Sequence, residues 1–224
     1  MGINFNAMGG APAPSPIASE NPAATIQQVP TANGGLTLDL SKGAILDLTK
    51  AAPGLDKCTL GAGWSVAAVG SPSIDLDISA FLLNENGRIT AVSDVIFFNN
   101  MEAAGIKKDK DDTTGGSSEE GDDEKIFLKL SEIPQKYQSI AVVVNIFDAI
   151  AKHQTFGMVK DAYVRLIDDS NGNEVLRFRL TSEAASSTAV YFCKLCRNAN
   201  GWSFEAVQEG MMAKDLNDVL ARFS

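Results

Sequence analysis

The sequence predicts an all-β protein: a β-sandwich of two antiparallel sheets with short peripheral helices and a C-terminal amphipathic helix. Two observations predict the sandwich, namely short segments in which apolar and polar residues alternate and glycine-containing turns at regular spacing between them. A third, apolar residues at helical spacing near the C-terminus, predicts the helix. With 45% hydrophobic residues, the 224-residue chain can bury a substantial core.

Composition narrows the classes of partner and compartment. The net charge is -9, and a chain this acidic lacks the basic face that nucleic-acid binding requires, so we expect no nucleic-acid partner. Three widely spaced cysteines form no disulfide framework, which favours a reducing compartment. The N-terminal stretch lacks the features of a secretory signal, and no window approaches the roughly 18 apolar residues of a membrane span. We therefore expect a cytoplasmic protein.

The chain divides into three parts by composition. Residues 1–35 are rich in Ala, Pro, Gly, Ser and Asn, and such a segment buries too little apolar surface to offset its ordering entropy. We predict a flexible arm there, with a partner-binding arm as the alternative. Residues 36–210 are the predicted sandwich domain. Residues 211–224 are the predicted C-terminal helix, which either packs on the domain or docks a partner.

The predicted strands follow one another from Leu36. The first pattern, "LTLDLSKGAILDLTK", reads as strand, turn and strand, and "CTLGAGWSVAA" follows it as another strand. Three hairpins are predicted at Asn86-Gly87, Asn171-Gly172 and Asn200-Gly201, because Asn-Gly is a strong hairpin-turn signal. In the first hairpin "DVIFFNN" returns alongside "SIDLDISAFLL". The segment "KIFLKL" is a further strand, and "SIAVVVNIFDA" is apolar almost throughout, which is typical of a central strand.

The C-terminal pattern is helical. In "GMMAKDLNDVLARFS" the apolar residues fall at helical spacing, which indicates a short amphipathic helix. These residues are Met212, Leu216, Val219, Leu220 and Phe223.

The residues that catalysis would need are sparse. His153 is the one histidine, and no nucleophile motif surrounds it, so we expect a surface or loop-supporting residue. Cys193 and Cys196 have the spacing of a zinc or redox pair, but in a strand they point to opposite faces and we expect buried strand cysteines. "DDSNGNEV" resembles part of a calcium loop but lies at a predicted hairpin tip. We expect a protein that is not an enzyme.

The segment "DKDDTTGGSSEEGDDEKIFLKL", residues 109–130, concentrates carboxylates. Between residues 109 and 124 it holds eight of them, with Lys110 as the one cation. Such a cluster is either a solvated loop or a site for a hard cation, since calcium takes six to eight oxygen ligands in irregular geometry. Composition alone leaves both open.

Hairpin topology brings further oxygen donors into consideration. If the chain turns at Asn86-Gly87, then Asp75 and Asp77 lie at the strand end far from the turn, on one face. Asn99 lies at the matching end of the return strand, whereas Asp94 falls nearer its middle. The acidic segment leaves from that end. We therefore expect Asp75, Asp77, Asn99 and the "GDDE" residues Asp122, Asp123 and Glu124 to converge at one edge of the sandwich.

At these residues the sequence resembles the TerD family of tellurium-resistance and chemical-stress proteins. The resemblance runs from Leu36 to Gly210 and depends on an ordered set of motifs rather than on one of them. The matching pieces are "LSKG", "APGL", "GAGW", "DLDISAFLLNENGRI", "SDVIFFNN", "GDDE", "FDAIAKHQTFGMVKDAYVRLID" and "GWSFEAVQEG".

The resemblance implies a calcium-binding β-sandwich that is cytoplasmic or held at the inner membrane surface by protein partners, with no established catalytic residues. It assigns the family's Asp-x-Asp strand to Asp75 and Asp77 and its Gly-Asp-Asp-Glu to residues 121–124. One or two calcium ions are implied. The family's loop usually reads Gly-Asp-Asn-Leu-Thr-Gly, whereas this chain has "KDDTTGG" and a longer spacer. Asp111 and Asp112 best match the Asp-Asn pair, and the changed length leaves the second calcium position open.

Two functions follow as hypotheses. In the first, the protein is a calcium-dependent scaffold or sensor in a stress-response assembly of proteins. In the second, it is a structural or assembly subunit that keeps the sandwich, oligomerises through the N-terminal arm and has reduced or lost its calcium dependence. Metal-assisted hydrolysis at the acidic site is the one enzymatic chemistry available, and calcium-type sites without a nearby nucleophile seldom serve it.

Overall fold

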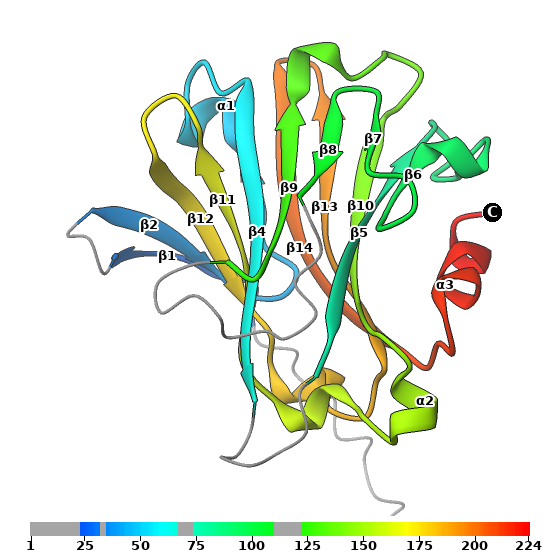
Figure 1. The fold of residues 1–224 in the computed structure, drawn as a ribbon. Coiled ribbons are helices and arrows are strands. Elements are labelled where there is room, and N and C mark those ends of the chain that lie inside the picture. Colours follow the sequence, from blue (N-terminus) through cyan, green and yellow to red (C-terminus); the bar gives the residue numbers. More distant parts are fainter. Residues whose placement is uncertain (1–22, 32–34, 67–73, 110–121) are drawn as a thin grey trace, which may run out of the picture.

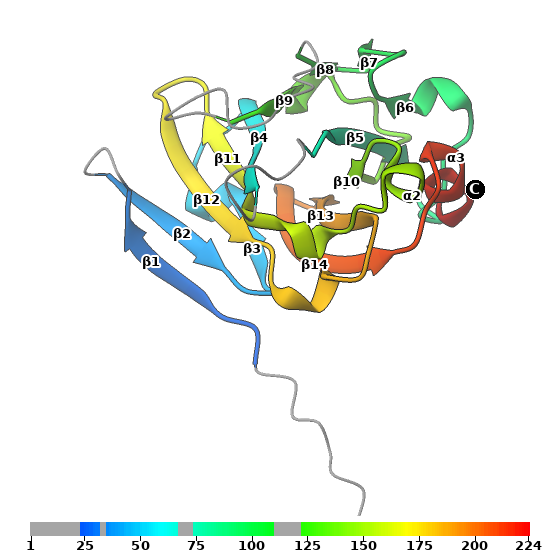
Figure 2. The same cartoon turned by 60° about the horizontal axis from the view of Figure 1, so that its bottom comes forward.

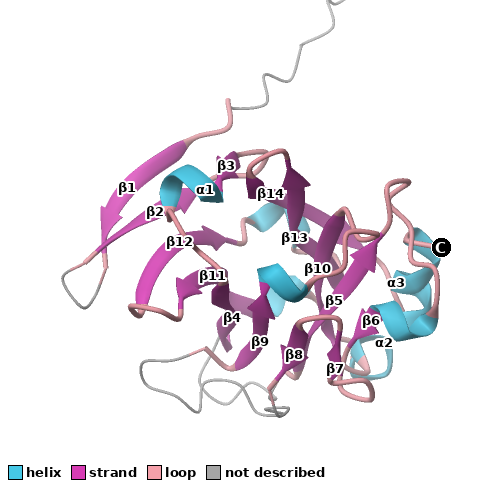
Figure 3. Cartoon of the chain, turned by 90° about the horizontal axis from the view of Figure 1, so that it is seen from above, coloured by secondary structure: helices cyan, strands magenta, loops and turns pink. Residues whose placement is uncertain are grey.

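The strands of the protein form two sheets packed face to face. The structure is a computed structural model that describes residues 23–31, 35–66, 74–109 and 122–224. Figure 1 shows the two layers side by side, and Figure 3 shows them end on. In the described ranges the strands make one sheet of eight, in the order β1-β2-β12-β11-β4-β9-β8-β7, and one of six, in the order β3-β14-β13-β10-β5-β6. The predicted all-β sandwich is confirmed.

The eight-stranded sheet contains the segments on both sides of the acidic stretch. Its strands are β1 (Ile26–Pro30), β2 (Leu36–Leu40), β4 (Lys57–Val66), β7 (Glu102–Ala103), β8 (Ile106–Lys108), β9 (Glu124–Lys129), β11 (Val159–Asp168) and β12 (Asn173–Arg179). The six-stranded sheet contains β3 (Ile45–Asp47), β5 (Leu76–Leu83), β6 (Val95–Ile96), β10 (Ser139–Ile146), β13 (Ala189–Asn198) and β14 (Gly201–Met211).

The helices are short and peripheral. They are α1 (Leu48–Ala51), α2 (Ala149–Lys152) and α3 (Leu216–Arg222), with 3-10 turns at Val92–Asp94, Leu130–Glu132, Phe156–Met158 and Ser182–Ala184. No helix of the described chain is long and apolar enough to cross a lipid bilayer.

The main core lies between the sheets and is built by alternation along each strand. On β5, Leu76, Ile78 and Ala80 point inward, and on β11, Val164 and Leu166 do the same. A second core lies on the outer face of the six-stranded sheet, under α3. There Phe223 packs its ring 4.8 Å from that of Phe81. The C-terminal helix therefore packs on the domain, as one of the two sequence alternatives predicts.

The predicted turns form where residues with positive φ occur. Gly87 (φ 72°) and Gly172 (φ 73°) adopt the left-handed conformation that glycine tolerates without strain. The Gly87 amide donates to the Asn84 carbonyl at 3.0 Å, which closes the first hairpin.

The structure differs from the sequence prediction in the extent and pairing of some elements. Residues 26–30, assigned to the flexible arm, form the edge strand β1, because they pair antiparallel with β2 from Ile26↔Leu40 to Pro30↔Leu36. The sheets are not purely antiparallel, because β2 and β12 pair in parallel. The predicted strand, turn and strand from Leu36 are present as β2 and β3, and these two strands belong to opposite sheets. Figure 2 shows the β1–β2 hairpin on the side of the molecule opposite α3.

The return strand after Asn86-Gly87 is also shorter than predicted. β6 spans only Val95–Ile96, because the chain before it is occupied by a 3-10 turn around the buried Asp94. The Asp94 carboxylate accepts hydrogen bonds from Thr90 and, at 2.6 Å, from the Tyr137 hydroxyl. The C-terminal helix, predicted over 211–224, begins only after its N-cap Asp215, so Met212 is exposed and lies outside it.

Candidate functional site

The three acidic residues that lead into β9 point to three different environments. Asp122 lies on the outer face of the eight-stranded sheet, over Gly61 of β4. Its side chain is fully buried, and Arg165 of β11 holds it with two hydrogen bonds, from Nε at 2.7 Å and from Nη2 at 3.0 Å. A Cβ on Gly61 would overlap the Asp122 carboxyl group. The glycine in "GAGW" therefore makes room for this ion pair.

The ion pair of Asp122 extends into a network on the same outer face. Arg165 also donates to Glu174 of β12 at 3.2 Å, and Arg177 donates to Glu174 at 2.6 Å. The Arg177 guanidinium lies 4.2 Å from the centre of the Tyr163 ring, a cation–π contact. Burial opposes the charged form of Glu174, yet the hydrogen bonds and charges of Arg177 and Arg165 lower the pKa of this carboxyl below its usual 4.5.

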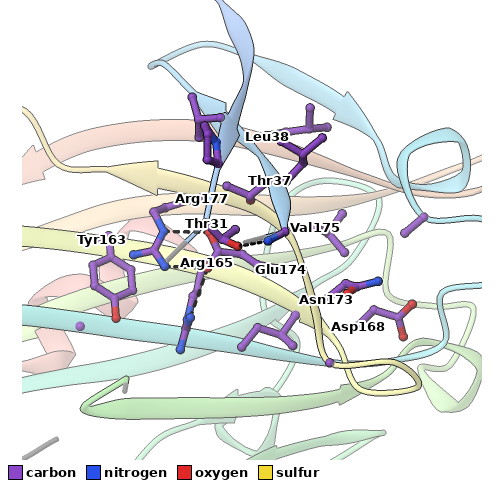
Figure 4. Close-up of a pocket in the computed structure, with 18 of the residues that line it drawn as sticks. Thr31, Thr37, Leu38, Tyr163, Arg165, Asp168, Asn173, Glu174, Val175 and Arg177 are labelled. Atoms are coloured by element: carbon purple, nitrogen blue, oxygen red, sulfur yellow. Dashed lines mark hydrogen bonds and ion pairs between the residues drawn. The ribbon is translucent and has the colours of Figure 1, made fainter. Parts of the chain in front are cut away.

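The network forms the floor of a polar groove of roughly 1200 Å³ on the outer face of the eight-stranded sheet. Figure 4 shows Tyr163, Arg165, Glu174 and Arg177 side by side in it, with Thr37 of β2 opposite. A Cβ on Gly63 would lie 2.5 Å from the Tyr163 hydroxyl oxygen, so the second glycine of "GAGW" gives the Tyr163 ring its place.

Asp123 lies at the end of the sandwich where β5 and β9 begin. Its carboxylate accepts a hydrogen bond from the Trp64 amide at 3.0 Å, and its own amide donates to Ala62 at 2.9 Å. The indole Nε1 of Trp64 donates to the carbonyl of Ile74 at 3.2 Å. Trp64 therefore links Asp123 to the residue that precedes Asp75.

Glu124 points into the core between the sheets. Its carboxylate forms an ion pair with Lys108 of β8, and the two side chains are 0% and 1% exposed. The amide of Ile78 on β5 lies 3.4 Å from the same carboxylate oxygen. Two buried opposite charges in contact form a structural ion pair, which costs desolvation but leaves no charge uncompensated.

Asp75 directly precedes β5, and Asp77 is the second residue of the strand. Asp77 is 5% exposed, pairs in register with Asn145 of β10 and faces outward from the six-stranded sheet. The register Ala80↔Ile96 extrapolates to Asn99 opposite Asp77. The chain leaves that register, however, in the tight turn between Phe97 and Asn100. Asn99 is exposed in this turn and is not part of the predicted return strand.

Calcium takes six to eight oxygen ligands, and the predicted donors lie in different environments. Of the eight predicted ligands, Asp111 and Asp112 lie outside the described residues. In the ranges that are described, no group of three or more His, Cys, Asp or Glu side chains is arranged to hold a metal ion. Asp122 and Glu124 are held by Arg165 and Lys108, which gives both a structural role. Asp75, Asp77 and Asp123 have the hard oxygen atoms that suit calcium, and the binding itself stays a prediction.

Of the residues that the sequence analysis excluded from catalysis, His153 and Cys193 lie as expected, whereas Cys196 is less buried than predicted. His153 is exposed after α2. Cys193 is buried in the core between the sheets, whereas Cys196, three positions on, is half-buried and faces the other way beside Lys194. Burial raises the pKa of the Cys193 thiol well above its usual value, which disfavours the reactive thiolate.

The sequence analysis did not identify the basic side chains that pair with Asp122 and Glu124. Arg165 and Lys108 look like ordinary solvent-facing residues of alternating strands, and only the three-dimensional structure brings them to Asp122 and Glu124. The signal that could have found Arg165 is the pair of glycines in "GAGW". Small residues two apart on one strand face leave space for large side chains from neighbouring strands.

Fold and site together define a two-sheet β-sandwich with an acidic segment inserted between β8 and β9. Comparison with known proteins gives the family. The TerD domain matches residues 36–223, so the chain belongs to the TerD family.

Two relatives illustrate the match. The chain is 39% identical over 188 residues to the "Tellurium resistance protein TerD" of Serratia marcescens, covering 84% of this chain and 97% of the relative. It is 33% identical over 201 residues to the "Stress response protein SCP2" of Bacillus subtilis, covering 84% of this chain and all of the relative.

A solved structure has the same fold. It is a crystal structure of a homologue of the telluride resistance protein TerD from Streptomyces coelicolor, which superimposes with a TM-score of 0.61 at 22% identity. The match covers 76% of this chain and 99% of the other.

Replacing one or both partners of the buried ion pair tests its role. Lys108→Met leaves Glu124 as an uncompensated buried charge, and we expect it to lower the free energy of unfolding by about 3–5 kcal/mol. The double variant Lys108→Met/Glu124→Gln should lose less than the Lys108→Met single variant, because no charge remains. Urea unfolding followed by tryptophan fluorescence measures both. A double variant as unstable as the sum of the two singles would contradict a compensated pair.

The lowered pKa of Glu174 predicts a pH dependence. Because the folded-state pKa lies below the unfolded value, the stabilisation from Glu174 is fully present above pH 4.5 and is lost as the pH falls through the folded-state pKa. Glu174→Gln should therefore flatten the fall of unfolding free energy between about pH 5 and pH 3. The control is Glu183→Gln, since Glu183 is 59% exposed in its pair with Lys42. Equal acid profiles for both variants would rule out a special role for Glu174.

Proposed function

We propose that this chain is a calcium-binding stress-response protein that acts as a calcium-dependent scaffold or sensor rather than as an enzyme. Its relatives are named for tellurium resistance and for stress response, which supports a role in resistance to tellurite or related chemical stress. We place it in the cytoplasm, with proteins of a stress-response assembly as partners, some of which hold it at the inner membrane surface.

The observation that carries the proposal is where the acidic segment is anchored. β8 and β9 pair antiparallel, with Lys108 opposite Ile126, and the Asp109 amide donates to the carbonyl of Lys125 at 2.9 Å. The described residues on either side of the acidic segment, Asp109 and Asp122, therefore lie at the same end of the β8–β9 pair as Asp123. The contacts of Trp64 connect this point to the start of β5, where Asp75 and Asp77 lie.

In this proposal Asp75, Asp77 and Asp123 would each contribute oxygen ligands to one or two calcium ions. The acidic segment would supply the remaining ligands, since the described residues alone form no group of three metal-binding side chains. Bound calcium would supply positive charge that offsets the mutual repulsion of these carboxylates. Other residues of the chain would hold these ligands in position. Arg165 and Lys108 fix the strand entry through Asp122 and Glu124, and Trp64 keeps Asp123 next to the start of β5.

Calorimetry with calcium tests the proposal. We expect saturable binding of one or two ions, weakened about tenfold or more in each of Asp75→Asn, Asp77→Asn and Asp123→Asn, because each loses a charged oxygen donor. Glu85→Gln is the matched control, since Glu85 is exposed beyond the opposite end of β5. Heat release identical in the triple variant and the wild type, or none at millimolar calcium, would end the proposal.

The edge strand β1 supports a second candidate, an assembly subunit that oligomerises through its N-terminal arm. β1 is exposed along its length, and an exposed edge offers unpaired backbone groups to another chain. Removal of residues 1–35, the predicted arm, also removes β1. If the arm tethers neighbouring copies, size-exclusion chromatography in chelator should show an oligomer for the full chain and a monomer for the shortened one. A full chain that elutes as a monomer would rule this candidate out.

A further inference from the structure

The outer face of the six-stranded sheet carries an apolar pocket beside α3. Its volume is about 290 Å³, and it lies between the first half of β5, the segment around β6, the end of β10 and the C-terminal helix. This face is opposite the polar groove with Arg165 and Arg177, and no residue lines both.

The walls of the pocket are aromatic and aliphatic. Phe97 and Phe98 meet edge to face, with ring centres 5.2 Å apart, and Phe147 lies across from them at the end of β10. Leu216 and Leu220 of α3 form the remaining wall. The helix is fixed to the sheet by the buried Val219 and Phe223, so this wall belongs to a packed element.

Three of the apolar residues in the lining are strongly exposed. Val92 is 69% exposed, Phe147 45% and Phe98 42%. Single exposed apolar side chains are common on protein surfaces, but a group of them around a concavity is typical of an interaction site.

Among the charged residues of the lining, carboxylates outnumber cations. Asp77, Asp148 and Asp215 contribute three carboxylates, and Lys214 is the one cation among the lining residues. Asp215 caps α3 by accepting a hydrogen bond from the Asn217 amide at 2.8 Å, and its pKa is lowered by that bond. Outside the pocket, the Lys152 ammonium already lies 5.0 Å from the centre of the Phe147 ring. The charge and the aromatic faces both suit a cation next to an apolar group.

The size of the pocket sets the scale of the ligand. Sites for drug-sized molecules and cofactors begin at about 300 Å³, so this pocket holds one large side chain rather than a whole cofactor. An apolar side chain in the pocket with a positively charged neighbour at the acidic rim matches both the shape and the charge.

We infer that this pocket docks a peptide segment of a partner protein, in which an aromatic or large aliphatic anchor residue is flanked by Lys or Arg. The net charge of -9 on the whole chain steers a basic segment toward it. The inference does not depend on calcium binding, because Asp148 and Asp215 of the lining are not among the proposed calcium ligands and the apolar walls belong to the packed sandwich and to α3.

Peptide display followed by direct titration tests the inference. Random 12-residue peptides are selected against the full chain in chelator, and the enriched peptides are titrated by fluorescence polarisation. We expect an apolar anchor next to basic residues. We also expect binding to weaken about tenfold or more in the Phe98→Ala/Phe147→Ala variant, because buried aromatic anchors dominate such interfaces.

Matched variants distinguish binding in the pocket from nonspecific apolar binding and from the effect of charge. Phe127→Ala is the control, because Phe127 is 37% exposed on the other sheet, and it should bind as the wild type does. Asp148→Asn should weaken the basic peptides while leaving a peptide with Lys and Arg replaced by Gln unaffected.

Three outcomes would overturn the inference. The first is enrichment of peptides without a basic residue near the anchor. The second is equal binding to wild type and to Phe98→Ala/Phe147→Ala. The third is a dimer in sedimentation analysis that the same double variant abolishes, since that would make a second copy of the chain the occupant.

Discussion

The ion pair between Asp122 and Arg165 is the constraint on which the arrangement of the site depends. It is fully buried on the Asp122 side, and it fixes where the chain re-enters the eight-stranded sheet after the acidic segment. Because Asp122 is held on the outer face, the next residues are directed to the Trp64 amide and to Lys108 in the core. Three consecutive carboxylates thus avoid one another, although their sequence suggests a single cluster. Gly61 is what makes the ion pair sterically possible.

Much of the fold could be predicted from the sequence, because alternation and Asn-Gly turns are local signals. The hairpin of β11 and β12, the central β10 and the packed C-terminal helix all followed from such patterns. The short β6 was not predicted, because the chain before it forms a 3-10 turn around the buried Asp94, whose hydrogen-bond partners include the distant Tyr137 as well as Thr90. The site was predicted at the level of residue types. The partners of Asp122 and Glu124 were missed because strand neighbours in space are far apart in sequence.

The molecule presents two dissimilar outer faces. The eight-stranded sheet carries a polar groove with balanced arginines and carboxylates, whereas the six-stranded sheet carries the apolar pocket beside α3. Asp77 belongs to that pocket and to the proposed calcium ligands. If calcium binds as proposed, Asp77 would couple the ion to the charge of the proposed docking pocket.

The calcium site proposed for the Trp64 end of the sandwich can be observed through Trp64 itself. Its amide donates to Asp123 and its indole donates to Ile74, before the start of β5. Trp202 lies toward the other end of the sandwich, because it pairs with Arg197. The neighbouring Cys196 pairs with Ser139, which also pairs with Leu83 at the end of β5. Nitrogen–proton correlation spectra recorded during a calcium titration test the claim directly. If calcium binds there, we expect saturable shifts of the Trp64 amide and indole signals and no shift of the Trp202 indole signal. Unchanged Trp64 signals at millimolar calcium, or equal shifts of both indoles, would contradict it.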